Sequence, residues 1–387
     1  MKTRANRHLR NVLCSIAIAV AMAIAPTPGA AASTSRSSRP CHPCFQTVGY
    51  VTRWNPVEDR RLGMINTLIF AFAEIKHGAV GLSPAAENRL RPVIALKGRD
   101  PRLRVEISVG GWGAGGFSEA ASTAAGRRLF AESAAAMVRQ TGADGIDVDW
   151  EYPGISQSGI RSSPHDQQNF TLMLAAVRQA LDAQEKAAHE HYTLSVAIAD
   201  GPFVRYVDIP AVNRYVDWFN LMTYDFVNGL TTTTGNHTGL YASRWAPADA
   251  RTTNRAVHQF LAAGVPSRKL IIGVAFYGRA FDDVRPIHDG LYQPYGHFIA
   301  MIPWPKLVAD YINKHGFKRH WDVQAHAPFL WNPVTRTFIT YDSPRSIAAK
   351  DRYVVRHHLG GVMYWEQSLD PGGTLLRAIH DGLERTP

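Results

Sequence analysis

Eight short apolar runs rich in β-branched residues recur along the chain, and segments with helical spacing lie between them. The strand-like runs cover 47–52, 67–73, 104–109, 145–150, 192–199, 216–222, 269–275 and 360–364, and the clearest helical segments cover 124–140, 167–187, 251–263 and 346–357. Eight strands that alternate with helices predict the α/β class and a (β/α)8 TIM barrel. An open doubly wound sheet fits the same alternation.

The interval between the seventh and eighth runs interrupts this alternation. Residues 281–341 hold six prolines, many aromatic residues and two short strand-like pieces. We therefore expect a small α+β insertion at 282–340 within a catalytic barrel that covers 46–387. No repeat of the kind that marks solenoids or propellers is present.

The first residues have the pattern of a secretory signal peptide. Residues 1–10 carry four basic side chains, 12–25 are apolar, and 26–32 end in three alanines. This pattern predicts a signal peptide at 1–32 and a secreted, extracellular protein, with the periplasm as the alternative. The apolar run is shorter than the roughly 20 residues that a membrane span needs, and no later run reaches that length, so we expect no integral membrane association.

Two cysteines remain after the predicted cleavage, in a short leader at 33–45. They form the pattern Cys41-His-Pro-Cys44. Export permits an oxidised pair, and the motif precedes a strand directly instead of lying between a strand and a helix as in thioredoxin-like proteins. A structural disulfide is the favoured interpretation, with redox catalysis and metal binding as alternatives.

The basic charge of the chain belongs in part to its first residues. The full sequence has 42 basic and 32 acidic residues, and removal of 1–32 leaves 38 − 32 = +6. The remaining Lys and Arg residues are scattered and form no long run, which argues against nucleic acid as a partner.

Four carboxylates occur within residues 144–151, on a stretch that otherwise resembles a buried strand. Because side chains on a strand alternate between its faces, Asp147, Asp149 and Glu151 share one face, whereas Asp144 lies out of step and suits structural hydrogen bonding. Close carboxylates repel each other, which raises at least one pKa toward the range of a proton donor at neutral pH. A solvated strand end or a calcium site is the alternative, although calcium favours oxygens on a flexible turn.

The other predicted strands also end in residues suited to one kind of ligand. In a TIM barrel these ends meet at one rim. We call Asp147, Asp149 and Glu151 the acidic ladder. In chain order the strand ends supply Tyr50, Trp54, Phe72, Gly111, Trp112, this ladder, Met222, Tyr224, Asp225, Tyr277, Arg279 and Trp365. A sugar stacks its C–H face on flat aromatic rings and binds polar groups through its hydroxyls, so this set predicts a carbohydrate site. Any single Trp or Met222 could instead be core.

Two further motifs bear on the rim. Glycines 110 and 111 would let a ligand or the neighbouring acidic strand approach closely, although a simple turn explains them as well. The histidines at 189, 191, 357 and 358 have no acidic partner at metal-ligand spacing, so we expect no metal. No phosphate-binding glycine loop or nucleophile elbow is present.

Several motifs together resemble one known family. Residues 144–151 read DGIDVDWE and fit the signature DGxDxDxE of the glycoside hydrolase family 18 chitinases in full. The stretches SVGG at 108–111, MTYD at 222–225 and GGVMYW at 360–365 fit further elements of that family, and the likeness runs from about residue 47 to the C-terminus. The insertion resembles that of deep-cleft members. Ala275 departs from the proline that many relatives have there.

The resemblance implies a secreted chitinase that cleaves β-1,4-linked N-acetylglucosamine polymers with retention, by substrate-assisted catalysis and without a cofactor. Glu151 would be the general acid, and Asp149 would turn between Asp147 and Glu151. Tyr224 and Asp225 would hold the acetamido group. The remaining expected substrate contacts are Trp365 as the floor of the cleavage subsite, with Arg279 and Tyr277 on neighbouring hydroxyls.

Other functions fit the same residues. One is an endo-β-N-acetylglucosaminidase of the same fold that acts on N-glycans or peptidoglycan. Another is a chitin-binding lectin, although such relatives typically lack the acid at the position of Glu151. We expect a monomer whose partners are chitin or chitooligosaccharides.

Overall fold

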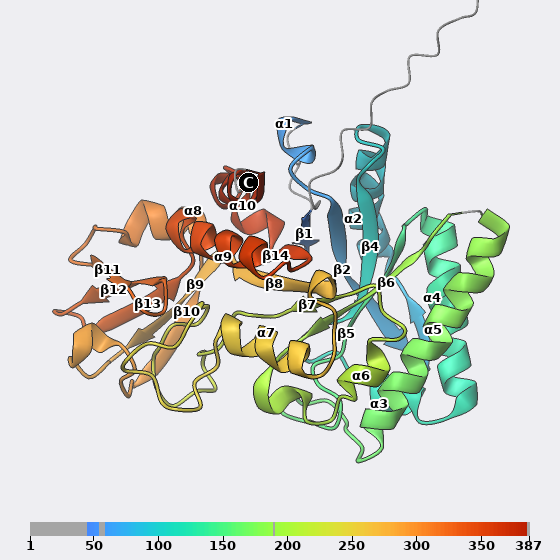
Figure 1. The fold of residues 1–387 in the computed structure, drawn as a ribbon, viewed down its shortest axis with the longest axis horizontal. Coiled ribbons are helices and arrows are strands. Elements are labelled where there is room, and N and C mark those ends of the chain that lie inside the picture. Colours follow the sequence, from blue (N-terminus) through green and yellow to red (C-terminus); the bar gives the residue numbers. More distant parts are fainter. Residues whose placement is uncertain (1–44, 54–58, 189, 385–387) are drawn as a thin grey trace, which may run out of the picture. The chain divides into compact units, whose positions relative to one another are not determined.

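Eight parallel strands close into a barrel (Figure 1). The computed structural model describes residues 45–53, 59–188 and 190–384. The barrel strands are β1 (Gln46–Val51), β2 (Thr67–Lys76), β4 (Arg104–Gly110), β5 (Gly145–Asp149), β6 (Thr193–Ile198), β7 (Trp218–Leu221), β8 (Leu270–Ala275) and β14 (Gly361–Trp365). Strand β1 pairs with both β2 and β14, which closes the sheet and excludes the open doubly wound alternative. The predicted TIM barrel is confirmed.

Helices surround the barrel (Figure 1). The longer ones are α2 (Pro84–Ala95), α4 (Ala124–Thr141), α5 (Asp166–Ala188), α7 (Thr253–Ala262), α9 (Pro344–Arg356) and α10 (Thr374–Glu384). The short ones are α1 (Asp59–Leu62), α3 (Phe117–Ala121), α6 (Ile209–Val212) and α8 (Trp304–Lys306). The four helices expected from the sequence begin and end within a few residues of these bounds.

Local signals in the sequence explain where these helices begin and end. The Thr123 hydroxyl accepts from the Gly126 amide at 3.0 Å at the start of α4, and Gly142 ends that helix with φ 76°. Thr252 caps α7 in the same way, and Ser343 opens α9 with a capping box. These caps satisfy amides that would otherwise lack partners in the first turn.

The barrel separates two kinds of core. The outer faces of the strands meet the helices through apolar side chains, for example Phe130, Met137 and Val138 of α4. The inner faces enclose a second cluster that is richer in aromatic side chains, among them Tyr50 and Tyr277. This inner face also carries buried polar residues, and it forms the base of the site described below.

A five-stranded antiparallel sheet follows β8 (Figure 1). Its strands are β9 (Tyr277–Asp282), β10 (His297–Pro303), β11 (Lys318–Asp322), β12 (Ala327–Asn332) and β13 (Thr337–Tyr341), in the order β10-β9-β13-β12-β11. Phe281, Phe329 and Phe338 form its core. The sheet begins at Tyr277, before the expected start at 282. It holds five strands, whereas the sequence indicated two short strand-like pieces. Pro303 and Pro328 lie within strands, where proline normally argues against that assignment.

Several smaller elements complete the described part. Strand β3 (Ala79–Gly81) pairs antiparallel with the end of β2. A π-helical turn covers Leu307–Tyr311, and 3-10 turns cover Leu96–Gly98, Gly201–Val204, Ser267–Lys269, His288–Gly290 and Gln367–Leu369. No helix within the described ranges is long and apolar enough to cross a membrane. The predicted signal peptide, the leader with Cys41 and Cys44, and Trp54 lie outside the described residues.

Candidate active site

A cavity of about 820 Å³ opens at the carboxyl ends of the barrel strands. Its lining includes the predicted residues Tyr50, Phe72, Trp112, Asp149, Glu151, Met222, Tyr224, Asp225, Tyr277, Arg279 and Trp365. Asp147 and Gly111 are not part of the lining and lie behind it. The strand ends therefore converge on one site, as the barrel geometry requires.

Asp147 is buried inside the barrel below the cavity and is surrounded by donors. Its Oδ2 accepts from the Tyr50 hydroxyl at 2.9 Å and the Ser108 hydroxyl at 2.7 Å. Its Oδ1 accepts from the Ser195 hydroxyl at 2.7 Å and the Asn220 amide at 3.3 Å. Burial raises the pKa of Asp147, and these hydrogen bonds oppose that rise by stabilising the carboxylate.

Asp149 lies one step nearer the cavity on the same face of β5. Its Oδ1 is buried and has no hydrogen-bond partner among the described residues. Burial raises the pKa of Asp149 well above its ordinary range, and the neighbouring Glu151 and Asp147 raise it further. That oxygen is therefore not held in one orientation by a hydrogen bond.

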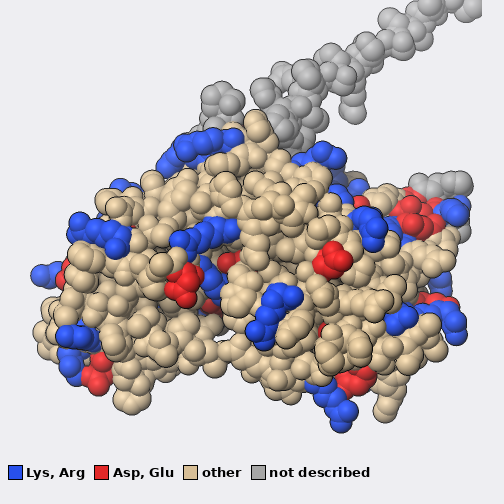
Figure 2. Space-filling view, turned by 60° about the horizontal axis from the view of Figure 1, so that its bottom comes forward, with Lys and Arg blue, Asp and Glu red and all other residues tan. Residues whose placement is uncertain are grey.

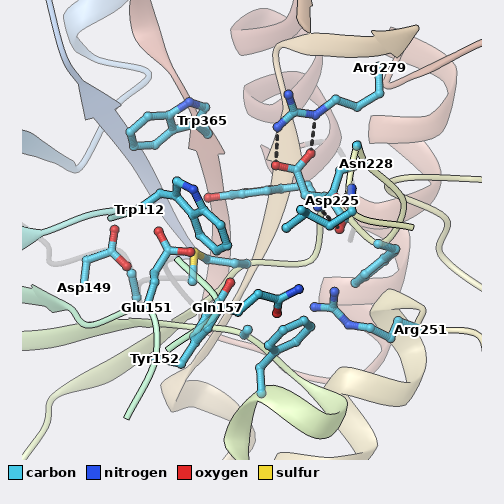
Figure 3. A pocket seen from close by; sticks show the side chains of 18 of the residues that line it. Trp112, Asp149, Glu151, Tyr152, Gln157, Asp225, Asn228, Arg251, Arg279 and Trp365 are labelled. Atoms are coloured by element: carbon cyan, nitrogen blue, oxygen red, sulfur yellow. Dashed lines mark hydrogen bonds and ion pairs between the residues drawn. The ribbon is translucent and has the colours of Figure 1, made fainter. Parts of the chain in front are cut away.

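Glu151 follows the last residues of β5 and lines the cavity (Figure 3). Burial raises its pKa to about 7, with a further rise from the charge of Asp225. Its backbone is fixed from the next loop, because the Ser158 hydroxyl donates to the Glu151 carbonyl at 2.7 Å. A carboxyl with a pKa near 7 can both donate and accept a proton at neutral pH.

Asp225 faces the acidic ladder from the other side of the cavity (Figure 3). Arg279 binds it with two parallel hydrogen bonds, from Nε to Oδ1 at 2.7 Å and from Nη2 to Oδ2 at 2.5 Å. His237 Nδ1 lies 3.6 Å from Oδ1. Although burial alone would raise its pKa, His237 and Arg279 hold the pKa of Asp225 below its ordinary range.

Aromatic rings form the base of the cavity beside the ladder. The Trp365 ring lies 5.5 Å from the Tyr50 ring and stacks on Phe72 at 5.9 Å between centroids. Trp112 is 54% exposed at the rim, with its ring 6.2 Å from that of Tyr152. These flat faces are suited to the C–H face of a sugar.

Glycines at the end of β4 make room for these side chains. Gly110 has φ 119°, and a Cβ there would overlap the Asp149 carbonyl. Gly111 has φ 96°, and a Cβ there would lie 2.7 Å from the Phe72 ring. The Gly111 amide also donates to the Asp149 carbonyl at 2.9 Å. The close approach of the acidic strand expected from the sequence is present, so the pair is more than a simple turn.

Asp144 takes no part in the cavity. Its Oδ2 accepts from the Val105 amide at 2.7 Å, and its Oδ1 pairs with Lys97 at 2.5 Å. The expectation of structural hydrogen bonding at the start of β5 is confirmed.

One further group of lining residues, on the side of Glu151 away from Trp365, was not predicted from the sequence. Arg251 lies over Phe203 and Phe226, at 4.8 and 5.0 Å from their ring centroids, and is paired with the buried Asp200 through two hydrogen bonds. Gln157, Asn228 and Phe298 also line the cavity. These residues lie on loops, on a 3-10 turn or on the insertion, so strand periodicity could not indicate them.

Charge outside the cavity follows no single pattern. Figure 2 shows Lys and Arg side chains scattered over the visible face, with acidic side chains among them. Among the described residues, no group of three or more His, Cys, Asp or Glu side chains could hold a metal ion.

Comparison with known proteins places this site in a family. A family model described as Glycosyl hydrolases family 18 matches residues 46–370. Chitinase A1 of Niallia circulans is 38% identical over 72% of this chain, which spans 42% of that protein's length. Chitinase 1 of Aphanocladium album is 33% identical over 76% of this chain and 69% of its own.

Solved structures agree with the sequence matches. A family 18 N-acetylglucosaminidase from Paenibacillus barengoltzii has a TM-score of 0.84 and 39% identity, covering 88% of this chain and 100% of its own. Chitinase ChiA74 from Bacillus thuringiensis has a TM-score of 0.82 and 29% identity, covering 89% of this chain and 70% of its own. Together with the acidic ladder, these matches show that the chain belongs to family 18 of the glycosyl hydrolases.

Proposed function

We propose that the chain is a chitinase that hydrolyses β-1,4 bonds between N-acetylglucosamine units with retention of configuration. One observation carries the proposal: Glu151, with a pKa near 7, lines a cavity whose base is Trp365 and whose opposite side carries an ion-paired Asp225. The cavity thus combines a proton donor, a stacking surface and polar groups for an acetamido substituent.

The proposed reaction uses the substrate's own acetamido group as nucleophile. Glu151 protonates the glycosidic oxygen while the acetamido oxygen attacks the anomeric carbon, and Asp149 stabilises the positive charge that develops on the acetamido nitrogen. Glu151, now a carboxylate, then removes a proton from the water that opens the oxazolinium ring. Two inversions at the anomeric carbon give net retention.

The arrangement of carboxylates supports this route over a carboxylate nucleophile. Asp225 is the acidic residue that faces Glu151 across the cavity, and both of its oxygens accept from Arg279. A carboxylate held by a bidentate guanidinium is a weak nucleophile, because its lone pairs and charge are engaged. Asp225 is better suited to hold the acetamido group, together with Tyr224.

The charges of the cavity favour a neutral glycan. Arg279 is paired with Asp225, and Arg251 is paired with Asp200. Since neither of these lining cations is left without an acidic partner, the described part of the cavity offers little to the lactyl carboxylate of peptidoglycan. A lectin function is disfavoured by the presence of Glu151.

A second candidate is an N-acetylglucosaminidase that releases single sugars. The likeness to the Paenibacillus barengoltzii structure, which this chain matches over its full length, supports it. The same residues would perform the chemistry, and the two candidates differ in the products that they release.

The product profile tests these proposals. Purified protein is incubated with N-acetylglucosamine hexamer, with an N-glycan and with a peptidoglycan fragment, and early products are separated by chromatography. Dimers and trimers from the hexamer support the chitinase, single sugars support the second candidate, and cleavage of only the N-glycan or peptidoglycan would contradict both. Binding without products would indicate a lectin.

We also propose that the chain is secreted after removal of a signal peptide. The pattern of residues 1–32 supports secretion of the mature chain. N-terminal sequencing of protein recovered from the medium of the native host should begin near residue 33, whereas a start at Met1 in the cell fraction would contradict it.

A further inference from the structure

A buried acidic residue lies beneath the ladder and has no role in the reaction described above. Glu106 is on the inner face of β4, two residues before Ser108, and its side chain is buried inside the barrel. Gly145 of β5 lies beside it, and a Cβ at that position would overlap Thr193 of β6. The missing Cβ lets the carboxyl of Glu106 reach across β5 to β6.

Glu106 reaches Asp147 through a single hydroxyl. Ser195 Oγ lies 2.8 Å from Glu106 Oε2 and 2.7 Å from Asp147 Oδ1. A serine hydroxyl has one hydrogen and can donate to only one of these oxygens. If both carboxyls were ionised, the other contact would bring two lone pairs together without a proton. One of the two carboxyls therefore carries a proton and donates it to Ser195.

The hydrogen-bond partners identify Glu106 as the protonated carboxyl. Asp147 accepts from three further donors, Tyr50, Ser108 and Asn220, which favours its ionised form. Glu106 has one further donor, Thr193, whose hydroxyl lies 2.5 Å from Oε1 and farther, at 3.2 Å, from the Asp144 carbonyl oxygen. This is the pattern of a neutral carboxyl, in which the carbonyl oxygen accepts and the hydroxyl donates. Burial also raises the pKa of Glu106 to about 8.

We propose that Glu106 is a proton store for the acidic ladder and exchanges its proton with Asp147 through Ser195. In the exchange the Glu106 Oε2–H bond breaks as its proton bonds to Ser195 Oγ, and the original Ser195 proton moves to Asp147 Oδ1. The products are a Glu106 carboxylate, a neutral Asp147 and an unchanged serine. Glu106 is thus a positioning residue that acts through Asp147.

The exchange matters because charge changes at the top of the ladder during turnover. This step rests on the proposed function: when Glu151 gives up its proton, a new negative charge faces Asp149 and Asp147. A proton moved up from Glu106 neutralises Asp147 at that moment without contact with solvent. At least one carboxyl of the ladder then keeps a proton throughout the catalytic cycle.

The surroundings of Glu106 favour its neutral form. The acidic groups that act on it are Asp147 on β5 and, farther away, Asp217 ahead of β7, and both raise its pKa. Asp217 is itself 3.5 Å from Arg178 and 3.2 Å from His191, which reduces its influence. Thr193 and Ser195 lower the pKa of Glu106 through their hydrogen bonds, but burial outweighs them.

The position of the proton can be tested on the protein without substrate. Infrared spectra at neutral pH should show protonated carboxyl bands, and Glu106→Gln should remove one of them. Asp351→Asn is the matched control, since burial also raises the pKa of Asp351 on α9, away from the cavity. Raising the pH through 7 should shift the Glu106 band in the native protein, where Glu151 ionises, and leave the Asp351 band in place, and the shift should be smaller in Glu151→Gln. An unchanged set of bands in Glu106→Gln would overturn the proposal.

Kinetics test the exchange itself. Glu106→Gln keeps the shape and the donor to Ser195 but has no proton to give. We expect kcat to fall several-fold, its decline at high pH to begin roughly one pH unit lower, and KM to stay within about twofold. Ser195→Ala should move the pH profile in the same direction, whereas Asp351→Asn should not move it. A kcat profile in Glu106→Gln that matches the native one would overturn the exchange.

These outcomes separate this inference from the proposed function. A native protein that cleaves no glycan but shows the Glu106 band would contradict only the proposed function. A native protein that cleaves chitin oligosaccharides and lacks the band would contradict only the proton store.

Discussion

Acidic side chains lie on both sides of the cavity, and their pKa values are shifted in opposite directions. Asp147, Asp149 and Glu151 on one side all have a raised pKa, whereas Asp225 on the other has a lowered pKa. Burial acts in the same direction on both sides. The difference comes from the partners: neutral hydroxyls and an amide surround Asp147, one oxygen of Asp149 has no partner among the described residues, and Asp225 lies beside His237 and a guanidinium.

The comparison shows how one cavity can hold both mobile protons and a fixed charge. Hydrogen bonds from neutral groups moderate the effect of burial on Asp147 without removing it. His237 and the fork of Arg279 together reverse that effect on Asp225 and keep it ionised over the whole working range of pH. A substrate between them would meet a proton donor on one side and a constant acceptor on the other.

Glu151→Gln should have the largest effect, because it removes the proton that the ladder side supplies. We expect kcat on chitin oligosaccharides to fall by roughly 10³ or more, toward the upper end of the effect of a positioned acid. Binding should persist, since the shape of the side chain is kept. Turnover assays and calorimetry on the same oligosaccharide measure the two effects, and near-normal turnover would refute the assignment of Glu151.

Asp149→Asn should have the next largest effect. It keeps the side chain in place but ends the coupling between Asp147 and Glu151, so kcat should fall by roughly 10². Because the pKa of Asp149 is itself raised well above its ordinary range, Asp149→Asn removes little charge near neutral pH, so the loss of rate should be similar across that pH range. A pH series of kcat/KM measures this, and an unchanged rate would mean that the ladder is not the working site.

Arg279→Gln should reduce the difference between the two sides. Without the guanidinium, His237 alone opposes burial, so the pKa of Asp225 rises and its charge becomes more sensitive to pH. We expect kcat/KM to fall by roughly 10- to 100-fold, with a steeper loss at low pH, and Arg279→Lys to recover only part of it because the bidentate geometry is lost. Arg251→Lys, at the other paired arginine, is the comparison variant. Equal pH profiles for Arg279→Gln and the native protein would contradict the role of the ion pair.

The ladder side of this comparison was largely readable from the sequence. Strand periodicity placed Asp147, Asp149 and Glu151 on one face and Asp144 off it, because alternation of side chains is a local property of the backbone. The same alternation on β4 puts Glu106 and Ser108 on the inner face, so a polar residue in an apolar run was the available sign of Glu106.

The opposite side was readable only in part. Asp225 and Arg279 lie 54 residues apart, and their pairing depends on how β9 of the insertion meets the loop after β7. Arg251 comes from a loop and Phe203 from the 3-10 turn at Gly201–Val204, and their approach depends on long-range contacts. No period in the sequence encodes such contacts, so Arg251, Phe203 and the pairing of Asp225 with Arg279 came only from the structure.

The smallest expected effect concerns stability and tests the electrostatics of the ladder side without catalysis. The pKa of Glu106 is about 8 in the folded chain against an ordinary 4.5, so the folded state keeps a proton that the unfolded state releases. The resulting stability is fully present below pH 4.5 and is lost as pH rises to about 8, by a few kcal/mol at most for a shift of this size. Glu106→Gln lacks this loss. Its melting temperature should match that of the native protein near pH 5 and exceed it by several degrees near pH 8.

Glu132→Gln, at a side chain that is 66% exposed, should follow the native protein at both pH values. A constant difference between Glu106→Gln and the native protein across this range would mean that Glu106 titrates as an ordinary carboxyl, and that burial beneath the ladder does not hold its proton.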